Sequence, residues 1–250
     1  MRARIAAYAG FQLKDYFTGR AMVGVLATAA IAWGYAFRRG LTVSMFDSSG
    51  GLEAREQLQQ AFEFVLAVFA FAAAVLAAQG LVARDRSRGY DRAMFSRPVS
   101  PARYYLQSFV LAGLGSTILG AIAAQLYAAT VHPVSVVGVA LYVALVWLAM
   151  GSLAFLLSTV TRLHVVVLGC VIGAAFALDA FVGTLATGGG RSVLELAQYV
   201  LPPAHVLVAL RGPFARGLMI DPRSVAWPLA FGTACLLVSL LMLRRRPFGS

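Results

Sequence analysis

Six long apolar runs dominate this chain of 250 residues, and each is close to the length that a helix needs to cross a lipid bilayer. A hydrocarbon core of about 30 Å is crossed by roughly 20 apolar residues in helical form. The chain is 60% hydrophobic and 12% charged, so it is far more apolar than an average soluble domain. We therefore predict an all-α integral membrane protein that forms one domain over residues 1–250. Its six predicted transmembrane helices cover about residues 21–37, 64–83, 104–131, 134–160, 165–187 and 224–243.

The distribution of lysine and arginine predicts which way these helices cross the membrane. With a cytoplasmic N-terminus, fourteen cationic residues lie on the inner side and seven on the outer side, where acidic residues nearly balance them. Inner loops carry the excess of Lys and Arg, so we expect both termini in the cytoplasm, in a multi-pass protein of the cytoplasmic membrane. This asymmetry and anionic lipid headgroups account for the net charge of +11. Nucleic acid is not a predicted partner, because such binding needs a basic face with room for a duplex.

The first seventeen residues are predicted to form an amphipathic helix in the headgroup layer. Ile5, Tyr8 and Leu13 fall near one helical face, whereas Arg4 and Lys14 lie off it. About twenty mixed residues before a long apolar run do not match a cleaved signal peptide, so we expect the segment to be retained. A frayed tail is the alternative.

The chain lacks the residue patterns of an enzyme. Cys170 and Cys235 fall inside predicted spans without metal-ligand spacing, and no histidine is placed to meet a serine within the membrane. The only lysine, Lys14, is preceded by Leu13 rather than by a glycine-rich turn, so there is no P-loop. We therefore predict no catalysis, cofactor or metal on this chain, and a membrane-embedded enzyme is the least favoured class. If its work is driven by ATP, another polypeptide must bind the nucleotide.

Residues 84–103, between the second and third predicted spans, form a connection unlike the others. It holds six arginines and two aspartates in twenty residues, so we expect it in water on the cytoplasmic side. Gly89 permits a tight turn, while Pro98 and Pro101 prevent a helix over residues 90–97 from fusing with the third span. Such a charged connection between two membrane helices is suited to bind a soluble partner. The alternative is that its arginines only anchor the loop to lipid headgroups.

Several short motifs follow one another in and just after this connection. They are Arg84-Asp85, Gly89, Pro98-Val99-Ser100 and Tyr104-Tyr105-Leu106. In this order they resemble the coupling segment of permease subunits from type-2 exporters of the ATP-binding-cassette family. The chain departs from that pattern at Tyr90, where threonine is usual, and at Ser108, where a lysine often occurs.

The resemblance implies a function and a set of partners. A separate ATP-binding-cassette ATPase, carrying ATP and Mg, would dock on the short helix and tilt the second and third spans to export a substrate. The permease would work as a pair, either a homodimer or a paralogous heterodimer, surrounded by membrane lipids. The residues implied to couple to the ATPase are Arg84, Asp85, Arg86, Gly89, Tyr90, Arg92, Met94, Phe95, Arg97, Pro98, Val99 and Ser100.

The connection between the fifth and sixth predicted spans, residues 188–223, contains two short apolar stretches. Residues 193–201 and 204–211 are too short to cross the membrane, and we expect the second to stop at Gly212-Pro213. By resemblance, these short outer helices dip into the outer leaflet or cap the bundle, and ordinary surface helices are the alternative. The same connection suggests a second function, in which a non-transporting mechanical or scaffold subunit passes motor force to an extracytoplasmic partner.

Asp179 is an ionisable residue deep in the fifth predicted span. It lies fifteen residues into that span, where an isolated charge costs about 2.5 to 3.5 kcal/mol on insertion scales. We expect it to line a substrate path or to pair with an arginine such as Arg191, Arg38 or Arg39. Alternatively, the helix ends early and leaves the carboxylate in water at the outer interface.

Two predicted spans carry small residues at four-residue spacing, a pattern that lets helices approach closely. For the fifth span, packing within the chain is the favoured interpretation and contact with a second subunit is the alternative. The residues are Gly169, Gly173 and Ala177 in the fifth span, and Ser116, Gly120 and Ala124 in the third.

Overall fold

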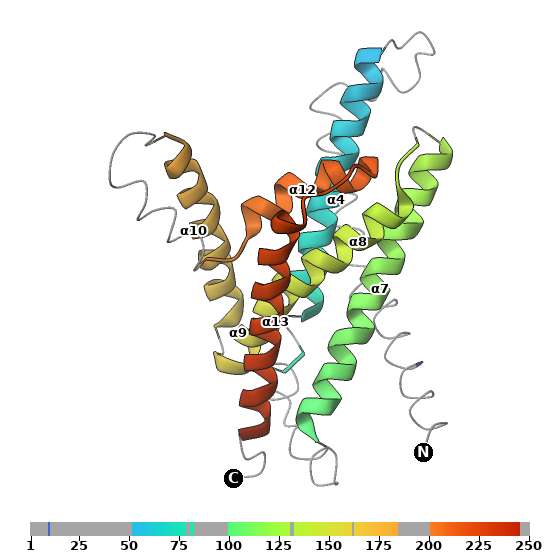
Figure 1. Cartoon of the computed structure of the whole chain (residues 1–250). Coiled ribbons are helices and arrows are strands. Elements are labelled where there is room, and N and C mark those ends of the chain that lie inside the picture. Colours follow the sequence, from blue (N-terminus) through green and yellow to red (C-terminus); the bar gives the residue numbers. More distant parts are fainter. Residues whose placement is uncertain are drawn as a thin grey trace.

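A computed structural model describes residues 10, 52–78, 81–82, 100–130, 133–161, 163–184 and 201–245 of the chain. Every regular element in these residues is helical, as predicted (Figure 1). The elements are α4 (Leu52–Ala78), α7 (Pro101–Thr130), α8 (Val136–Val146), the π-helical segment η2 (Trp147–Gly151), α9 (Ser152–Val160), α10 (His164–Thr184), α12 (Ala204–Arg216) and α13 (Pro222–Arg245).

Among the described residues, four helical stretches are long and apolar enough to cross a membrane. They agree with four of the six predicted spans and indicate a multi-pass membrane protein. α10 contributes a shorter apolar stretch, Val166–Leu178, and the first predicted span, residues 21–37, lies outside the described residues. The four stretches are Glu56–Ala78, Pro101–Ala129, Val136–Val160 and Pro222–Arg245.

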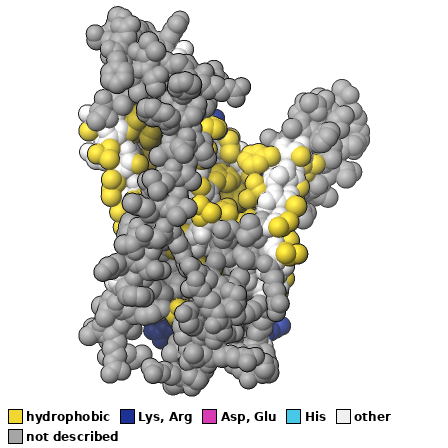
Figure 2. Space-filling view, turned by 180° about the vertical axis from the view of Figure 1, so that it is seen from behind, with side chains coloured by type: hydrophobic (Ala, Val, Ile, Leu, Met, Phe, Trp, Pro, Cys, Tyr) yellow, Lys and Arg dark blue, Asp and Glu magenta, His cyan; other side chains and the backbone are white. Residues whose placement is uncertain are grey.

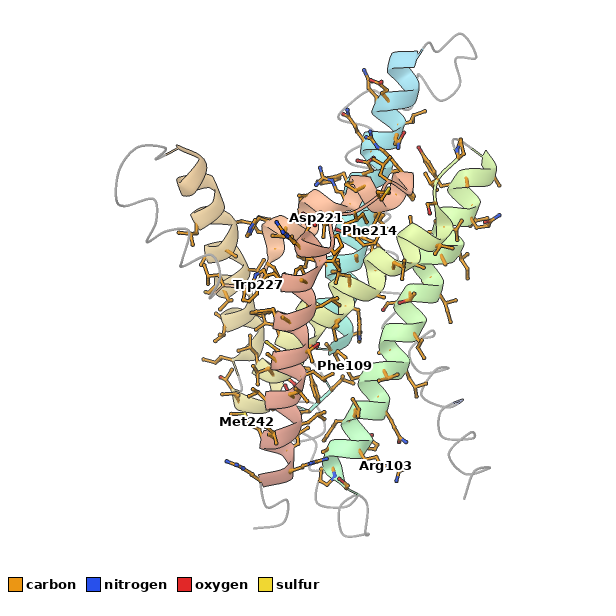
Figure 3. The ribbon with its side chains drawn as sticks, in the orientation of Figure 1. Arg103, Phe109, Phe214, Asp221, Trp227 and Met242 are labelled. Atoms are coloured by element: carbon orange, nitrogen blue, oxygen red, sulfur yellow. The ribbon has the colours of Figure 1, made fainter. Side chains whose placement is uncertain are left out.

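Successive long helices run in alternating directions and define two ends of the bundle (Figure 1). α12, the start of α13 and the turn between α7 and α8 lie at one end, which we call the α12 end. The start of α7, the end of α13 and the turn between α9 and α10 lie at the other, which we call the Arg103 end. Figure 3 places Phe214 and Asp221 at the α12 end, and Arg103 and Met242 at the Arg103 end. The predicted location of the two termini, which lie outside the described residues, stays a prediction.

The continuous span of α8, η2 and α9 is the centre of the packed helices. Of its most apolar window, 72% is buried, against 22 to 44% for the other three spans. α8 packs against α7 and α12, η2 packs against α4 and α13, and α9 packs against α13 and α10. Tyr142, Met150 and Phe155 are fully buried in this span. Because lipid tails are as apolar as these side chains, close packing rather than hydrophobic burial must hold the helices together.

Two glycines show how closely neighbouring helices approach η2. A Cβ atom added at Gly232 of α13 would overlap the backbone carbonyl of Leu148. A Cβ atom added at Gly113 of α7 would overlap the indole of Trp147. The wide π turn of the central span is therefore enclosed by small residues on both sides.

The outer faces of the bundle are apolar. On α7, large exposed side chains recur at every fourth position and so lie in one stripe along the helix. Figure 2 shows that the described side chains over the middle of one face are hydrophobic, with Lys or Arg side chains towards its lower end. This is the distribution expected for a lipid-facing surface. The stripe on α7 comprises Val110, Leu114, Ile118, Ile122 and Leu126.

One helix extends beyond its predicted apolar run, and one predicted boundary was wrong. α4 begins at Leu52 rather than near residue 64, because a helix can continue past the apolar stretch that hydropathy detects. α12 continues through Gly212 and Pro213 to Arg216, because burial of the following Phe214 and Ala215 offsets the hydrogen bond that proline cannot donate.

The end of α12 is set by Gly217 rather than by the Gly212-Pro213 pair. Gly217 adopts the left-handed conformation, with φ of 65°. Its N–H donates to the Phe214 carbonyl at 3.2 Å, and the Leu218 N–H donates to the Pro213 carbonyl at 3.0 Å. These two bonds form a Schellman motif, which satisfies the last carbonyls of the helix.

Candidate functional site

Charged residues from separate helices meet at the α12 end, where Glu63 of α4 pairs with Arg216 of α12. The Nε of Arg216 donates to Oε1 of Glu63 at 2.9 Å. The Glu63 side chain is 9% exposed, whereas that of Arg216 is 47% exposed. A carboxylate inside a membrane span is costly unless it is paired. The ion pair therefore ties α4 to α12.

The surrounding backbone holds both partners in place. A Cβ atom at Gly212 would lie 3.0 Å from Oε2 of Glu63, so the absence of a side chain there lets the carboxylate approach α12. Next to Arg216, the carbonyl of Ala215 accepts a 2.8 Å bond from the N–H of Ser135. The Ser135 hydroxyl in turn accepts from the N–H of Gly138 at 3.0 Å and caps α8. α12 is thus joined to α4 by the ion pair between Glu63 and Arg216, and to the start of α8 by a backbone hydrogen bond.

An open pocket of about 510 Å³ lies beside this ion pair. Its lining includes Glu63, His205, Arg211, Arg216 and Leu218. The two guanidinium groups carry two positive charges and the carboxylate carries one negative charge, so these three groups together have a net positive charge. Arg211 makes no hydrogen bond or ion pair with the residues that the structure describes. Its planar set of N–H donors is therefore available to a ligand.

Several buried polar atoms in the described helices also have no hydrogen-bond partner there. They include the hydroxyl of Tyr142, Nε1 of Trp147 and Oγ of Ser152 on the central span, and the hydroxyl of Tyr127 on α7. An unmade buried hydrogen bond costs about 1 to 3 kcal/mol, so such atoms are places where water or a ligand group can bind. Tyr142 lies next to α12, since its ring centroid is 6.0 Å from that of Phe214.

Most of the residues predicted to couple to an ATPase lie outside the described residues. Ser100 is described: it is exposed, and its carbonyl accepts from the N–H of Tyr104 at 3.1 Å as α7 begins at Pro101. The coupling role of the whole segment stays a prediction. The residues outside the described part are Arg84, Asp85, Arg86, Gly89, Tyr90, Arg92, Met94, Phe95, Arg97, Pro98 and Val99.

Asp179 lies on α10, but its side chain is outside the described part of the structure. The helix continues five residues beyond it, to Thr184. The helix therefore does not end at Asp179, and the predicted substrate-path or ion-pair role of that carboxylate stays a prediction.

The small residues of α10 are exposed rather than packed. Gly169, Gly173 and Ala177 all lie on the surface, and a Cβ atom added at either glycine meets no atom within 4 Å. The two glycines of the ridge therefore make no close contact, and its packing within the chain stays a prediction. Contact with a second subunit stays a prediction.

The ion pair between Glu63 and Arg216 was not predicted. Glu63 is one of the acidic residues expected on the outer side, and its position between Phe62 and Phe64 in an increasingly apolar stretch is the available signal of a paired carboxylate. Its partner is 153 residues away in the sequence, so no local pattern could identify the pairing.

No protein-family model, curated protein sequence or solved structure matches this chain at a significant level. Its function must therefore be inferred from its own residues and geometry.

Proposed function

We propose that this chain is the membrane-spanning permease subunit of an exporter in the cytoplasmic membrane, driven by a separate ATP-binding-cassette ATPase. The observation that carries the proposal is the arginine-rich segment of residues 84–99, with its resemblance to a coupling segment. α4 ends at Ala78 and α7 starts at Pro101, so this segment connects two helices that pack against each other. A partner bound to it would act on both helices together.

The charges support a cytoplasmic position for the Arg103 end. Arg103 lies at the start of α7, and Arg244 and Arg245 lie in the last turn of α13. The acidic residues Glu63 and Asp221 belong to the opposite end, near α12. Arg211, Arg216 and Arg223 lie at the α12 end, so the described helices alone carry no arginine excess at either end. The five arginines of residues 84–99, which join the Arg103 end at α7, supply the excess that favours a cytoplasmic side.

The packing offers a mechanical route across the bundle. α4 packs against α7, η2 and α12. A push on the segment after α4 would tilt α4 and α7, and the ion pair between Glu63 and Arg216 would carry that movement to α12. In a paired permease this movement would open a path outward between the subunits.

The same ion pair favours a second candidate function. If α12 binds an extracytoplasmic protein, the chain is a mechanical subunit that passes force from the ATPase without moving a substrate. Both functions require the ATPase, and they differ in whether purified complexes reconstituted into vesicles move a solute or lipid between the two sides.

Co-purification tests the proposed coupling site. The triple variant Arg92→Ala, Met94→Ala, Phe95→Ala removes the apolar and charged contacts expected on the short helix. We expect the native chain to retain a stoichiometric ATPase and the variant to lose it, as measured by quantitative mass spectrometry of the purified complex.

A matched control removes similar side chains from the α12 end. Arg223, Leu218 and Met219 are exposed there, and their combined replacement by alanine should leave the ATPase bound. Retention of the ATPase by the Arg92, Met94 and Phe95 variant would contradict the proposal.

A further inference from the structure

The open pocket beside Glu63 and Arg216 has the chemistry of an anion site. We propose that it binds a phosphate group, presented either by a membrane phospholipid headgroup or by a soluble phosphate ester. The site is defined by Arg211 and Arg216 on α12, with Glu63 and His205 in the same lining. It is separate from the predicted coupling segment and does not depend on the proposed function.

Arginine is the side chain best suited to this ligand. Its planar guanidinium group donates two parallel hydrogen bonds to phosphate oxygens and remains charged at all relevant pH values. Arg211 has no partner among the described residues, and only the Nε of Arg216 is bonded, to Glu63. The pocket therefore offers one complete guanidinium group and the outer N–H groups of a second.

Glu63 would repel a phosphate, but its position limits that repulsion. Its carboxylate is nearly buried, faces Gly212 on one side and is paired with Arg216. Pairing with Arg216 offsets most of the charge of Glu63, and the unpaired charge of Arg211 remains in the same lining. The carboxylate thus orients Arg216 rather than competing with the ligand.

A buried phenol lies beside α12, the pocket-lining helix. Tyr142 is 0% exposed, and its hydroxyl has no partner in the described residues. Tyr142 also packs against Phe214 of α12. Tyr142 does not line the pocket, so its hydroxyl is a separate place where a water molecule or a small polar group can bind.

The depth and rim of the pocket suit a lipid. Glu63 lies seven residues after Glu56, where the apolar stretch of α4 begins, so it is roughly 10 Å along the helix from that point. Leu218, in the pocket lining, is 56% exposed, and the adjacent Met219 is fully exposed. Apolar side chains beside arginines match the boundary between acyl chains and headgroups.

The test compares Arg211→Gln with Arg223→Gln in the purified full chain. Both variants remove one exposed or partly exposed cation near the α12 end, but Arg223 lies outside the pocket. One arm measures binding to vesicles and nanodiscs of phosphatidylcholine with phosphatidylglycerol, and retained lipid is counted by native mass spectrometry. The other arm titrates inorganic phosphate and glycerol 3-phosphate in detergent.

We expect Arg211→Gln to weaken phosphate binding about tenfold, since a hydrogen-bonded charged group contributes about 1.5 kcal/mol or more. Arg211→Lys keeps the positive charge but loses the paired N–H donors, so we expect a smaller loss of phosphate binding. This variant also serves as a control for a folding defect in Arg211→Gln. A loss in the lipid arm identifies a headgroup, and a loss confined to the titration identifies a soluble ester. Equal binding by Arg211→Gln and Arg223→Gln in both arms would overturn the proposal, even if the ATPase still co-purifies.

Discussion

The small-residue ridges of α7 and α10 have the same sequence pattern but opposite surroundings. On α7, Ser116 and Ala124 are 0% exposed, and a Cβ atom at Gly120 would lie 2.8 Å from Cγ2 of Val143 on α8. On α10, Gly169 and Gly173 face open space. The small-residue pattern therefore indicates that another helix can approach closely. Whether a helix does so depends on the fold around it. In Figure 1, α10 diverges from the remaining helices towards the α12 end.

The largest expected loss of stability comes from a substitution at Gly120, on the packed ridge of α7. Gly120→Leu forces a large side chain between α7 and α8, so we expect it to lower the free energy of unfolding by about 2 kcal/mol, as is typical of overpacking. The measurement is reversible denaturation in mixed micelles. Unchanged stability would show that the contact between Gly120 and Val143 is looser than the structure indicates.

A smaller loss is expected from Gly113→Ala, seven residues before Gly120 on α7. The added methyl group overlaps the indole of Trp147, which is 5% exposed and has little room to move. The helix gains slightly from alanine in place of glycine, so we expect a net loss of about 1 kcal/mol. Changed near-ultraviolet circular dichroism of the tryptophans would accompany it, and a stabilised variant would contradict this packing.

The smallest effect is expected on α10. Gly173→Leu enters open space, so the stability of the isolated chain should change by less than about 0.5 kcal/mol. If the ridge contacts a second subunit, the same substitution weakens the dimer, which sedimentation in detergent measures. A loss of monomer stability as large as that of Gly120→Leu would remove the distinction between the ridges.

Much of the bundle could be predicted from the sequence, because hydrocarbon thickness dictates helix length. The third, fourth and sixth predicted spans lie within three residues of α7, of α8 to α9, and of α13. The start of α4 at Leu52 could not be predicted from hydropathy, since the helix begins before its apolar stretch, Glu56–Ala78.

The features that were missed depend on contacts between distant residues. Glu63 is tolerated in α4 because Arg216 reaches it from α12, and α12 passes through Pro213 because the residues after it are buried. The role of the ridge on α10 stays a prediction for the same reason, as the pattern contains no information about its neighbour. The segment of residues 84–99 was assigned from motifs, and its role stays a prediction.

Photo-cross-linking at residue 95 tests most directly whether that segment binds an ATPase. Phe95 is replaced by a photoreactive phenylalanine analogue, and the same analogue at Leu114, which is 53% exposed on the lipid-facing stripe of α7, serves as control. We predict that irradiation of intact membranes joins the probe at Phe95 to an ATP-binding-cassette ATPase, while the probe at Leu114 labels lipid. Labelling of lipid alone at both positions would show that the arginine-rich segment only anchors the loop, and would contradict the proposed function.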